Sequence, residues 1–386
     1  MRAHPPETDS GTGGRGAAPV GCAAGPGRSD VAAAEQRPAV RLPGLALSPP
    51  VFLAPMAGIT DLPFRRLVAS FGAGLVVSEM VASQEMVQAR PGVRARAALG
   101  LEEGAAAHCP TAVQLAGREA RWMAEAARMA EGSGARLIDI NMGCPARKVA
   151  GGGSGSALMR DPDHALSLIR AVVDAVSVPV TLKMRLGWDE TQLNAPEIAR
   201  RAAAAGVAMI TVHGRTRCQF YRGRADWAAI ARVKAAVNVP VIANGDITDP
   251  ETARRARSLS GADGVMMGRG AQGAPWQPAL VAAALRNGAM PEIPEGRAFA
   301  AMAGRHYEEM LSFHGRSLGL RVARKHLAWY MDRAATDPAL RREILTARQP
   351  AAVLARLPEA LGGFRLRPET SSTAPPRQPP QREAAA

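Results

Sequence analysis

The segment Leu137-Ile-Asp-Ile-Asn-Met-Gly-Cys-Pro145 joins an apolar run to a loop that carries a thiol. The run Leu137 to Ile140 predicts a short buried strand, and the Gly and Pro that follow force the backbone to leave the sheet and turn. Cys144 is therefore expected on a loop at the carboxyl end of a strand, where parallel α/β proteins bind their ligands. A small residue that fills a tight turn is the alternative interpretation of this cysteine.

The same pattern recurs along residues 50–270: a short apolar run, a loop with Gly or polar residues, and then an Ala-rich helical segment. Eight runs predict strands, at 51–54, 75–78, 112–115, 137–141, 178–183, 209–212, 239–243 and 264–267. Helices are expected between them at 62–71, 118–131, 162–176, 195–205, 227–236 and 250–259. This alternation predicts an α/β fold, a (β/α)8 TIM barrel, whose chemistry lies at the carboxyl ends of the strands.

Beyond residue 290 the alternation stops, and 298–313, 318–331, 338–346 and 351–357 predict helices. Both ends of the chain are rich in Gly, Ala, Pro or Ser and show no apolar periodicity, which is typical of solvated tails. We therefore expect a disordered N-terminal tail (1–40), a barrel domain (41–290), a small all-helical C-terminal domain (291–363) and a disordered C-terminal tail (364–386).

The formal net charge of +14 is distributed unevenly. Residues 297–367 hold 13 Lys or Arg against 6 Asp or Glu, so half of the positive excess follows the barrel. Bases stand beside aromatics at Arg324-Lys-His326 and Trp329-Tyr330, which favours an RNA-facing module, although an ordinary solvated helical bundle has the same pattern. No apolar run is long enough for a membrane span, and the four cysteines show no zinc spacing, so we expect a cytoplasmic protein without a metal.

Glycines and polar residues follow almost every predicted strand, and together they form a ring at one end of the barrel. The ends of the seventh and eighth strands place Gly245 and Gly268 beside Arg269, a combination that barrels commonly use for a phosphate. Asp246 alternatively caps the next helix. The span 268–273 also matches Gly-x-Gly-x-x-Gly, but no βαβ unit follows it, so a dinucleotide fold is excluded.

Six motifs on these strand ends resemble the tRNA-dihydrouridine synthases, bacterial B-type. They are Ala54-Pro-Met-Ala-Gly-Ile-Thr-Asp61, Asp139-Ile-Asn-Met-Gly-Cys-Pro145, Lys183-Met-Arg185, Val212-His-Gly-Arg-Thr-Arg217, Asn244-Gly-Asp246 and Met267-Gly-Arg-Gly270. The resemblance implies an FMN-containing barrel with a helical tRNA-binding domain that reduces uridine in tRNA to 5,6-dihydrouridine at the expense of NADPH. Its partners are then tRNA and NADPH. We expect a monomer, although the sequence itself does not indicate the oligomeric state.

By position, the resemblance implies that Cys144 is the proton donor. It assigns FMN contacts to Pro55, Met56, Ala57, Gln114, Lys183, His213, Asn244, Gly245, Asp246, Gly268 and Arg269. Lys183 is expected to place a positive charge near the flavin pyrimidine ring, with a buried ion pair as the alternative. His213 is expected to hydrogen-bond the flavin or its phosphate, with a structural histidine as the alternative.

Candidate substrate contacts complete the site. The amide of Asn141 complements a uracil edge, so we expect this residue to recognise the base. The basic candidates are Arg185, Arg215, Arg217, Arg324 and Lys325, of which the three on the barrel alternatively pair with acidic side chains.

The chemistry explains why a flavin and a thiol belong together. The C5=C6 bond of uracil is conjugated to the C4 carbonyl, so C6 accepts a hydride and C5 then needs a proton. No amino acid donates hydride, whereas a reduced flavin does. An unperturbed thiol has a pKa of about 8.5, so Cys144 holds its proton at neutral pH and can release it to a carbanion-like centre. A stacked base in folded tRNA must first be flipped out.

Two rival functions stay open. An FMN barrel oxidoreductase that acts on a free pyrimidine, as a dihydroorotate dehydrogenase does, has no use for a basic helical domain. A non-catalytic RNA-binding protein with this fold would be colourless. The sequence does not indicate which uridine is modified, and NADPH rather than NADH is implied only by the resemblance.

Overall fold

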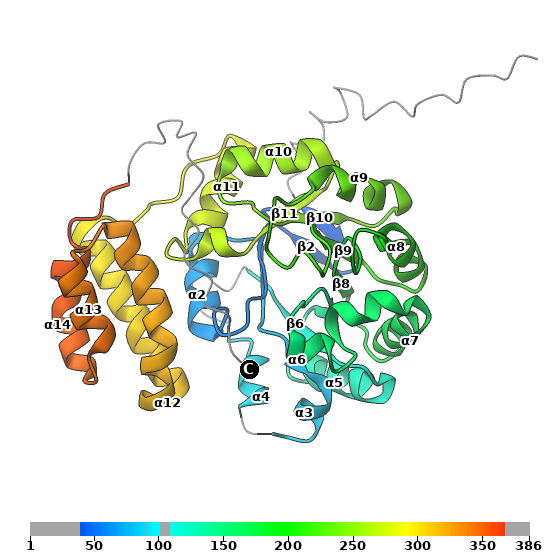
Figure 1. Ribbon diagram of the computed structural model, residues 1–386, viewed down its shortest axis with the longest axis horizontal. Coiled ribbons are helices and arrows are strands. Elements are labelled where there is room, and N and C mark those ends of the chain that lie inside the picture. The colour runs from blue at the N-terminus through cyan, green and yellow to red at the C-terminus, as the bar shows by residue number, and fades with distance from the viewer. Residues whose placement is uncertain (1–38, 91, 101–108, 367–386) are drawn as a thin grey trace, which may run out of the picture.

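The computed structural model describes residues 39–90, 92–100 and 109–366. Eight parallel strands form a closed barrel (Figure 1): β3 (Val51–Leu53), β4 (Leu75–Val77), β6 (Thr111–Ala116), β7 (Ile138–Met142), β8 (Val180–Arg185), β9 (Met209–His213), β10 (Val241–Asn244) and β11 (Gly264–Met267). Neighbours in the chain are neighbours in the sheet, and the pairs β3–β11 and β4–β6 close it. A two-residue strand, β5 (Val81–Ala82), extends the sheet beside β6. The predicted TIM barrel is confirmed.

An antiparallel hairpin of β1 (Val40–Leu42) and β2 (Leu45–Leu47) precedes the barrel. Its side chains Val40 and Leu47 are buried against residues from the starts of several strands, among them Leu75 and Met209. The hairpin therefore covers the amino-terminal end of the barrel, opposite the predicted site. It was not predicted, and Val40 belongs to it rather than to the expected tail. Most of the two expected tails, residues 1–38 and 367–386, lies outside the described part of the chain.

The helices around the barrel follow the predicted positions closely. They are α2 (Leu62–Phe71), α5 (Ala120–Gly132), α7 (Pro162–Val173), α8 (Ala195–Ala204), α9 (Trp227–Ala236) and α10 (Pro250–Ser260). Four of these helices begin after an aspartate whose carboxylate accepts a backbone N–H of the first turn, so the N-terminus of each is stabilised by its own N-cap. These N-caps are Asp61, Asp161, Asp226 and Asp249. Helix α11 (Gln277–Arg286) and the short helices α3 (Ser83–Val87), α4 (Val93–Arg96) and α6 (Arg147–Ala150) were not predicted.

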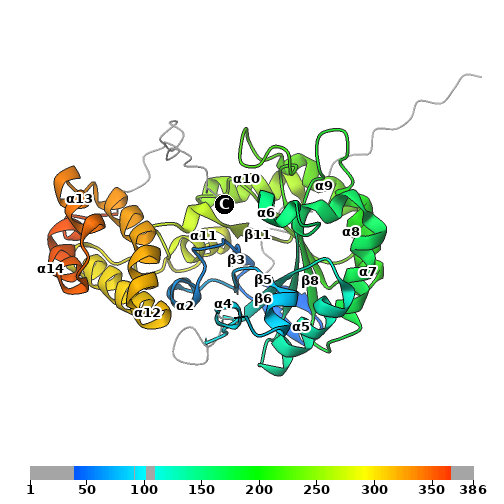
Figure 2. The ribbon, with the colours of Figure 1, turned by 60° about the horizontal axis from the view of Figure 1, so that its bottom comes forward.

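Three C-terminal helices pack together beside α2 (Figures 1 and 2): α12 (Gly296–Ala334), α13 (Pro338–Thr346) and α14 (Pro350–Leu361). Helix α12 is interrupted at Gly315, where φ is +73°, between the two helices predicted for this region. Phe364 is buried and its ring lies 4.4 Å from that of Phe299. The ordered structure therefore continues past the expected boundary at residue 363, because this ring completes the helical core.

The three helices α12, α13 and α14, here called the helical unit, pack against the barrel through an apolar cluster to which both contribute. Trp276, which follows the last barrel strand, is fully buried and its ring lies 5.7 Å from that of Phe299 on α12. A polar contact adds to this core, since His314 Nε2 lies 2.7 Å from Asp61 Oδ2 at the start of α2. The unit is thus fixed beside the loop that follows β3. None of the helices in the described ranges is long and apolar enough to cross a membrane.

Candidate active site

The loop after β7 holds Cys144 by both ends of its peptide. Asn141 Oδ1 accepts the backbone N–H of Gly143 at 3.2 Å and that of Cys144 at 3.0 Å. The carbonyl of Cys144 accepts the N–H of Ser156 at 3.1 Å and its hydroxyl at 2.8 Å. Burial raises the pKa of Cys144, although the amide of Ala146 and nearby cations oppose the rise. The thiol therefore carries its proton at neutral pH.

Asn141 and Gln114 contact each other inside the barrel. Asn141 Nδ2 donates to Gln114 Oε1 at 2.7 Å, and Gln114 Nε2 donates in turn to Asp139 Oδ2 at 2.7 Å. Both amides are buried and use their groups on protein partners. The structure thus places Asn141 as a cap on the Cys144 loop, and its predicted contact with a base stays a prediction.

Lys183 points toward the end of β10. Its Nζ donates to Asn244 Oδ1 at 3.0 Å, and Asn244 Nδ2 donates to the carbonyl of Met266 at 2.8 Å. Burial, together with the charge of Arg185, lowers the pKa of Lys183 to about 8, while Asp139 opposes the change. Lys183 therefore stays mainly protonated at pH 7, and its hydrogen-bond partner is an amide rather than the carboxylate of the alternative interpretation.

His213 is a buried, neutral imidazole at the end of β9. Burial and the charges of four neighbouring cations hold its pKa well below the ordinary value. Its Nδ1 is buried and has no hydrogen-bond partner in the described part of the chain. Its Nε2 faces the bare Cα of Gly245, where an added Cβ would lie 3.2 Å away. The ring thus has unused hydrogen-bonding capacity.

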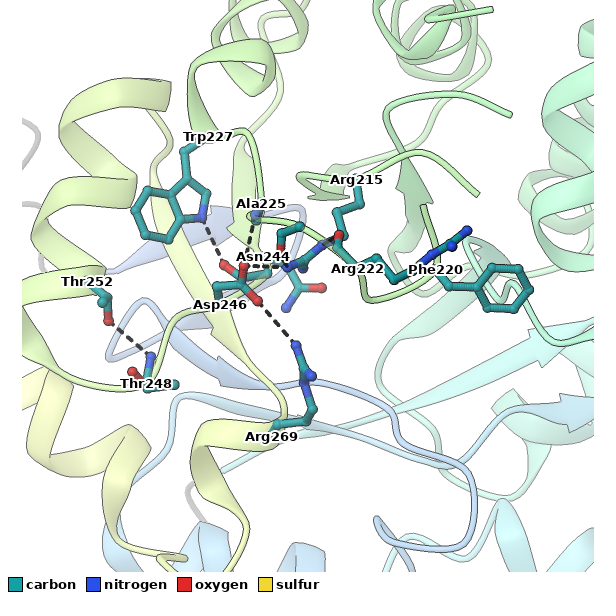
Figure 3. A network of polar contacts seen from close by, with 12 residues as sticks. Arg215, Phe220, Arg222, Ala225, Trp227, Asn244, Asp246, Thr248, Thr252 and Arg269 are labelled. Atoms are coloured by element: carbon teal, nitrogen blue, oxygen red, sulfur yellow. Dashed lines mark hydrogen bonds and ion pairs between the residues drawn. The ribbon is translucent and has the colours of Figure 1, made fainter. Parts of the chain in front are cut away.

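Asp246 connects the ends of β9, β10 and β11 (Figure 3). Its Oδ2 accepts from Arg215 Nη2 at 2.5 Å and from the N–H of Ala225 at 2.8 Å, and its Oδ1 lies 3.2 Å from Arg269 Nη2. The carboxylate is thus engaged with the protein and does not cap α10, whose N-cap residue is Asp249. Arg215 takes the ion-pair alternative, whereas the Arg269 side chain stays 47% exposed.

Glycines keep this end of the barrel open. Gly245 has φ +110°, and an added Cβ there would lie 2.9 Å from the Cβ of Ala225. At Gly268 an added Cβ would contact Met56 Sδ at 3.5 Å, so the segment of Pro55, Met56 and Ala57 lies against the end of β11. The bare backbone at these positions, the unpartnered Nδ1 of His213 and the exposed guanidinium of Arg269 fit a phosphorylated cofactor.

The remaining predicted arginines on the barrel support loops. Arg185 is buried; its Nε donates to the carbonyl of Gly143 at 2.8 Å and its Nη1 to those of Thr216 and Phe220 at 2.8 and 2.9 Å. The guanidinium of Arg217 stacks over Trp188 at 4.6 Å. Arg185 thus joins the Cys144 loop to the loop after β9 through carbonyl groups rather than the acidic side chains of the alternative, and its predicted contact with a tRNA phosphate stays a prediction.

The two predicted bases of the helical unit lie on the surface of α12. Arg324 and Lys325 are both exposed. Lys325 reaches the barrel rim, because its Nζ would lie 3.2 Å from a Cβ added to Gly58. A basic group of the helical unit therefore borders the loop after β3, close to the site.

Sequence reasoning missed two residues of this site. Asp139 lies in the interior beneath the Cys144 loop, and the only signal was an acid within an apolar run. Tyr221 is 43% exposed in the loop after β9, with Arg269 Cζ 5.2 Å and Arg185 Cζ 5.6 Å from its ring. Its signal was an aromatic residue among arginines. In the described ranges, no cluster of three or more His, Cys, Asp or Glu side chains is arranged to hold a metal.

The family model described as "Dihydrouridine synthase (Dus)" matches residues 52–362 of this chain. The chain belongs to the dihydrouridine synthase family. Membership confirms the predicted resemblance and the predicted enzyme class. The match includes the barrel and the C-terminal helices, so both parts of this dihydrouridine synthase family member lie within the region that the family model describes.

Named relatives of this dihydrouridine synthase family member are close over nearly their whole length. The chain is 65% identical to a "Probable tRNA-dihydrouridine synthase" of Rhodobacter capsulatus, over 83% of this chain and 97% of the relative. It is 47% identical to "tRNA-dihydrouridine synthase B" of Xanthomonas campestris, over 80% and 92%. The expected B-type is confirmed by this similarity. A histamine dehydrogenase structure from Rhizobium sp. 4-9 matches with a TM-score of 0.50 and 14% identity, over 70% of this chain and 50% of that one, which supports the barrel fold alone.

Proposed function

We propose that this chain reduces the C5=C6 bond of uridines in tRNA to 5,6-dihydrouridine, with FMN bound at the strand ends and NADPH as the reductant. The printed names of the relatives support tRNA as the substrate. The observation that carries the proposal is the geometry of Cys144, a protonated thiol held by both ends of its peptide at the carboxyl end of β7. A monomer in the cytoplasm belongs to the same proposal.

Different residues of the chain have separate roles in this proposed reaction. The chemistry expected of the bound flavin is hydride donation to C6 of the uracil. Cys144 holds a proton at Sγ for C5, and its raised pKa keeps that proton in place until a carbanion-like centre takes it. Lys183 keeps a positive charge inside the barrel mouth, where it favours an anionic ring. Arg269 and the neutral His213 offer donors to a phosphate.

The basic helical unit supports a macromolecular substrate over a free pyrimidine. One of its surface bases, Lys325, borders the barrel rim, and RNA is bound largely through its backbone and shape. A free pyrimidine needs no such surface. Comparison of turnover on tRNA with turnover on free uridine separates the two functions, and purified protein without a flavin absorbance band would favour the non-catalytic RNA-binding rival.

The thiol provides the sharpest test. Cys144→Ala should retain the flavin band and lose dihydrouridine formation by about a hundredfold or more, as expected for a lost general acid. Cys218→Ala is the matched control, because Cys218 is also a half-buried thiol, on the loop after β9. Dihydrouridine is measured in tRNA by mass spectrometry after NADPH addition. Equal turnover in the two variants would remove Cys144 from the mechanism.

A further inference from the structure

A chain of buried polar side chains leads from β8 to the Cys144 loop. Thr181 Oγ1 donates to Asp139 Oδ1 at 2.6 Å, and Gln114 Nε2 donates to the other oxygen of that carboxylate at 2.7 Å. Asn141 Nδ2 donates to Gln114 Oε1 at 2.7 Å, and its own oxygen accepts the amide of Cys144. All of these side chains are buried, and Asp139 is only 4% exposed.

The direction of these hydrogen bonds is fixed from both ends. The backbone amides of the Cys144 loop can only donate, so Asn141 must turn its oxygen toward them and its Nδ2 toward Gln114. An ionised carboxylate can only accept, so Gln114 must turn its Nε2 toward Asp139 and its oxygen toward Asn141. The two requirements agree. Turning over either amide alone would leave two like groups face to face.

Asp139 is the part of this chain that sets the direction. Its burial raises its pKa to about 6, against the opposing effects of Gln114, Thr181 and Lys183, so the carboxylate is mostly ionised at neutral pH. An amide in its place would offer both a donor and an acceptor to Gln114. The orientation of Gln114, and through it that of Asn141, would then be held from the loop end alone.

We propose that Asp139 is a positioning residue for Cys144, which acts by fixing the orientation of the Gln114 and Asn141 amides that hold the Cys144 loop. This inference rests on the proposed function, in which Cys144 is the proton donor. Asp139 is separated from the thiol by two side chains, so its effect is on the placement of the acid rather than on the chemistry itself.

Exchanging the acid and the amide between residues 139 and 114 tests whether Asp139 sets the donor-to-acceptor direction of these hydrogen bonds. Asp139→Asn removes the fixed acceptor, and Gln114→Glu sets two carboxylates against each other. In the double variant Asp139→Asn/Gln114→Glu the carboxylate moves from residue 139 to residue 114, the next side chain in the hydrogen-bonded series. Asn at 139 can then donate to Glu at 114, and Asn141 Nδ2 keeps an acceptor, so the loop cap keeps its orientation. The swap also retains a negative charge near Lys183.

Two readouts follow the swap. In each single variant we expect kcat to fall about tenfold, with KM for tRNA within about twofold, because the acid is misplaced while the RNA surface is intact. The alkylation rate of Cys144 by iodoacetamide in the folded protein, followed by peptide mass spectrometry, should rise about fivefold as the loop loosens. The double variant should return the alkylation rate to within about threefold of the original chain and raise kcat above that of either single variant, since paired sites in one network are not additive. The kcat values are compared at equal flavin content, because Gln114 is also a predicted FMN contact.

Asp263→Asn is the matched control. Asp263 is a buried carboxylate on the same barrel that accepts the N–H of Val241 at 2.8 Å and pairs with Lys234 at 2.6 Å. It lies just before β11, at the opposite end from Cys144, so its loss should affect stability but neither readout. The proposal is overturned if the single variants behave like Asp263→Asn, or if the double variant is no better than the worse single. Should the original chain form no dihydrouridine, the proposed function fails, and alkylation still tests the role of Asp139.

Discussion

Acidification should weaken the contact between the barrel and the helical unit through two buried histidines. His306 and His326 project from α12 toward α2, with their rings 5.8 and 4.9 Å from that of Phe64 and 4.8 Å from each other. Both are at most 2% exposed. Burial lowers the pKa of His306 to about 3 and that of His326 to about 4, with only partial opposition from Asp61. Both rings are therefore neutral in the folded protein at pH 5.

The loss of folding stability at low pH follows from the difference between the histidine pKa values in the folded and unfolded chains. An unfolded histidine has a pKa of about 6.5, so between pH 6.5 and the folded value the unfolded chain binds the extra proton. Stability from these groups is complete above pH 6.5 and is lost as the pH falls. A pH of 5 is about 1.5 units below the unfolded pKa, so each histidine lowers the free energy of unfolding by about 2 kcal/mol relative to pH 8. The two costs add to about 4 kcal/mol, because only the unfolded chain titrates in this range.

Urea denaturation at pH 8 and pH 5 measures this loss. The comparison is with His306→Gln/His326→Gln, in which the other titrating groups are retained and cancel in the difference. The free energy of unfolding of the original chain, relative to this variant, should fall by about 4 kcal/mol between pH 8 and pH 5. The single variant His326→Gln should account for about half of that fall. A difference that stays constant within about 1 kcal/mol over this range would refute the reasoning.

Three further substitutions, with Leu366→Ala as a control for one of them, test the ion pair at the site and the packing of the helical core. Asp246→Asn leaves the buried guanidinium of Arg215 without its countercharge, and we expect a loss of about 3–5 kcal/mol in urea denaturation, together with weaker flavin retention. Phe364→Ala removes a buried ring from the helical core and should cost about 3–5 kcal/mol, whereas Leu366→Ala, at 41% exposure, should cost less than about 0.5 kcal/mol. Gly273→Ala should lower the melting temperature, because φ is +68° and the added Cβ would lie 2.7 Å from the carbonyl oxygen of Trp329.

The barrel could be predicted because its strands are buried on both faces and therefore form continuous apolar runs. Each of the eight predicted runs corresponds to a strand of the structure. The hairpin β1–β2 was missed because its strands, unlike the equally short β3 and β4, are only partly buried, and the Pro43-Gly44 turn between them predicts a loop. Helix α11 was missed because it directly follows a Gly-rich and Pro-containing segment that predicts a loop.

The candidate site could be predicted as a set of positions but not as a set of contacts. Motifs identify which residues follow the strands, whereas partners depend on how strands distant in the sequence align. Gln114 and Asn141 are 27 positions apart, and Arg185 and Phe220 are 35 apart. No local pattern indicates such pairs. This is why the protein partners of Asn141 and Arg185 were not predicted, while their expected contacts with the substrate stay predictions.

The contacts also explain how the site combines a positive charge with a neutral histidine. Lys183, Arg185, Arg215 and Arg269 all lower the pKa of His213, which shows that their charges reach the same point of the barrel mouth. The carboxylates of Asp139 and Asp246 are the acidic partners inside this network, and two negative charges offset the four positive ones only in part. The positive charge at the barrel mouth then disfavours a second proton on the His213 ring and favours an anion beside it. The same charges that keep the imidazole neutral thus attract a phosphorylated ligand toward its Nδ1, which no carboxylate of the described residues occupies.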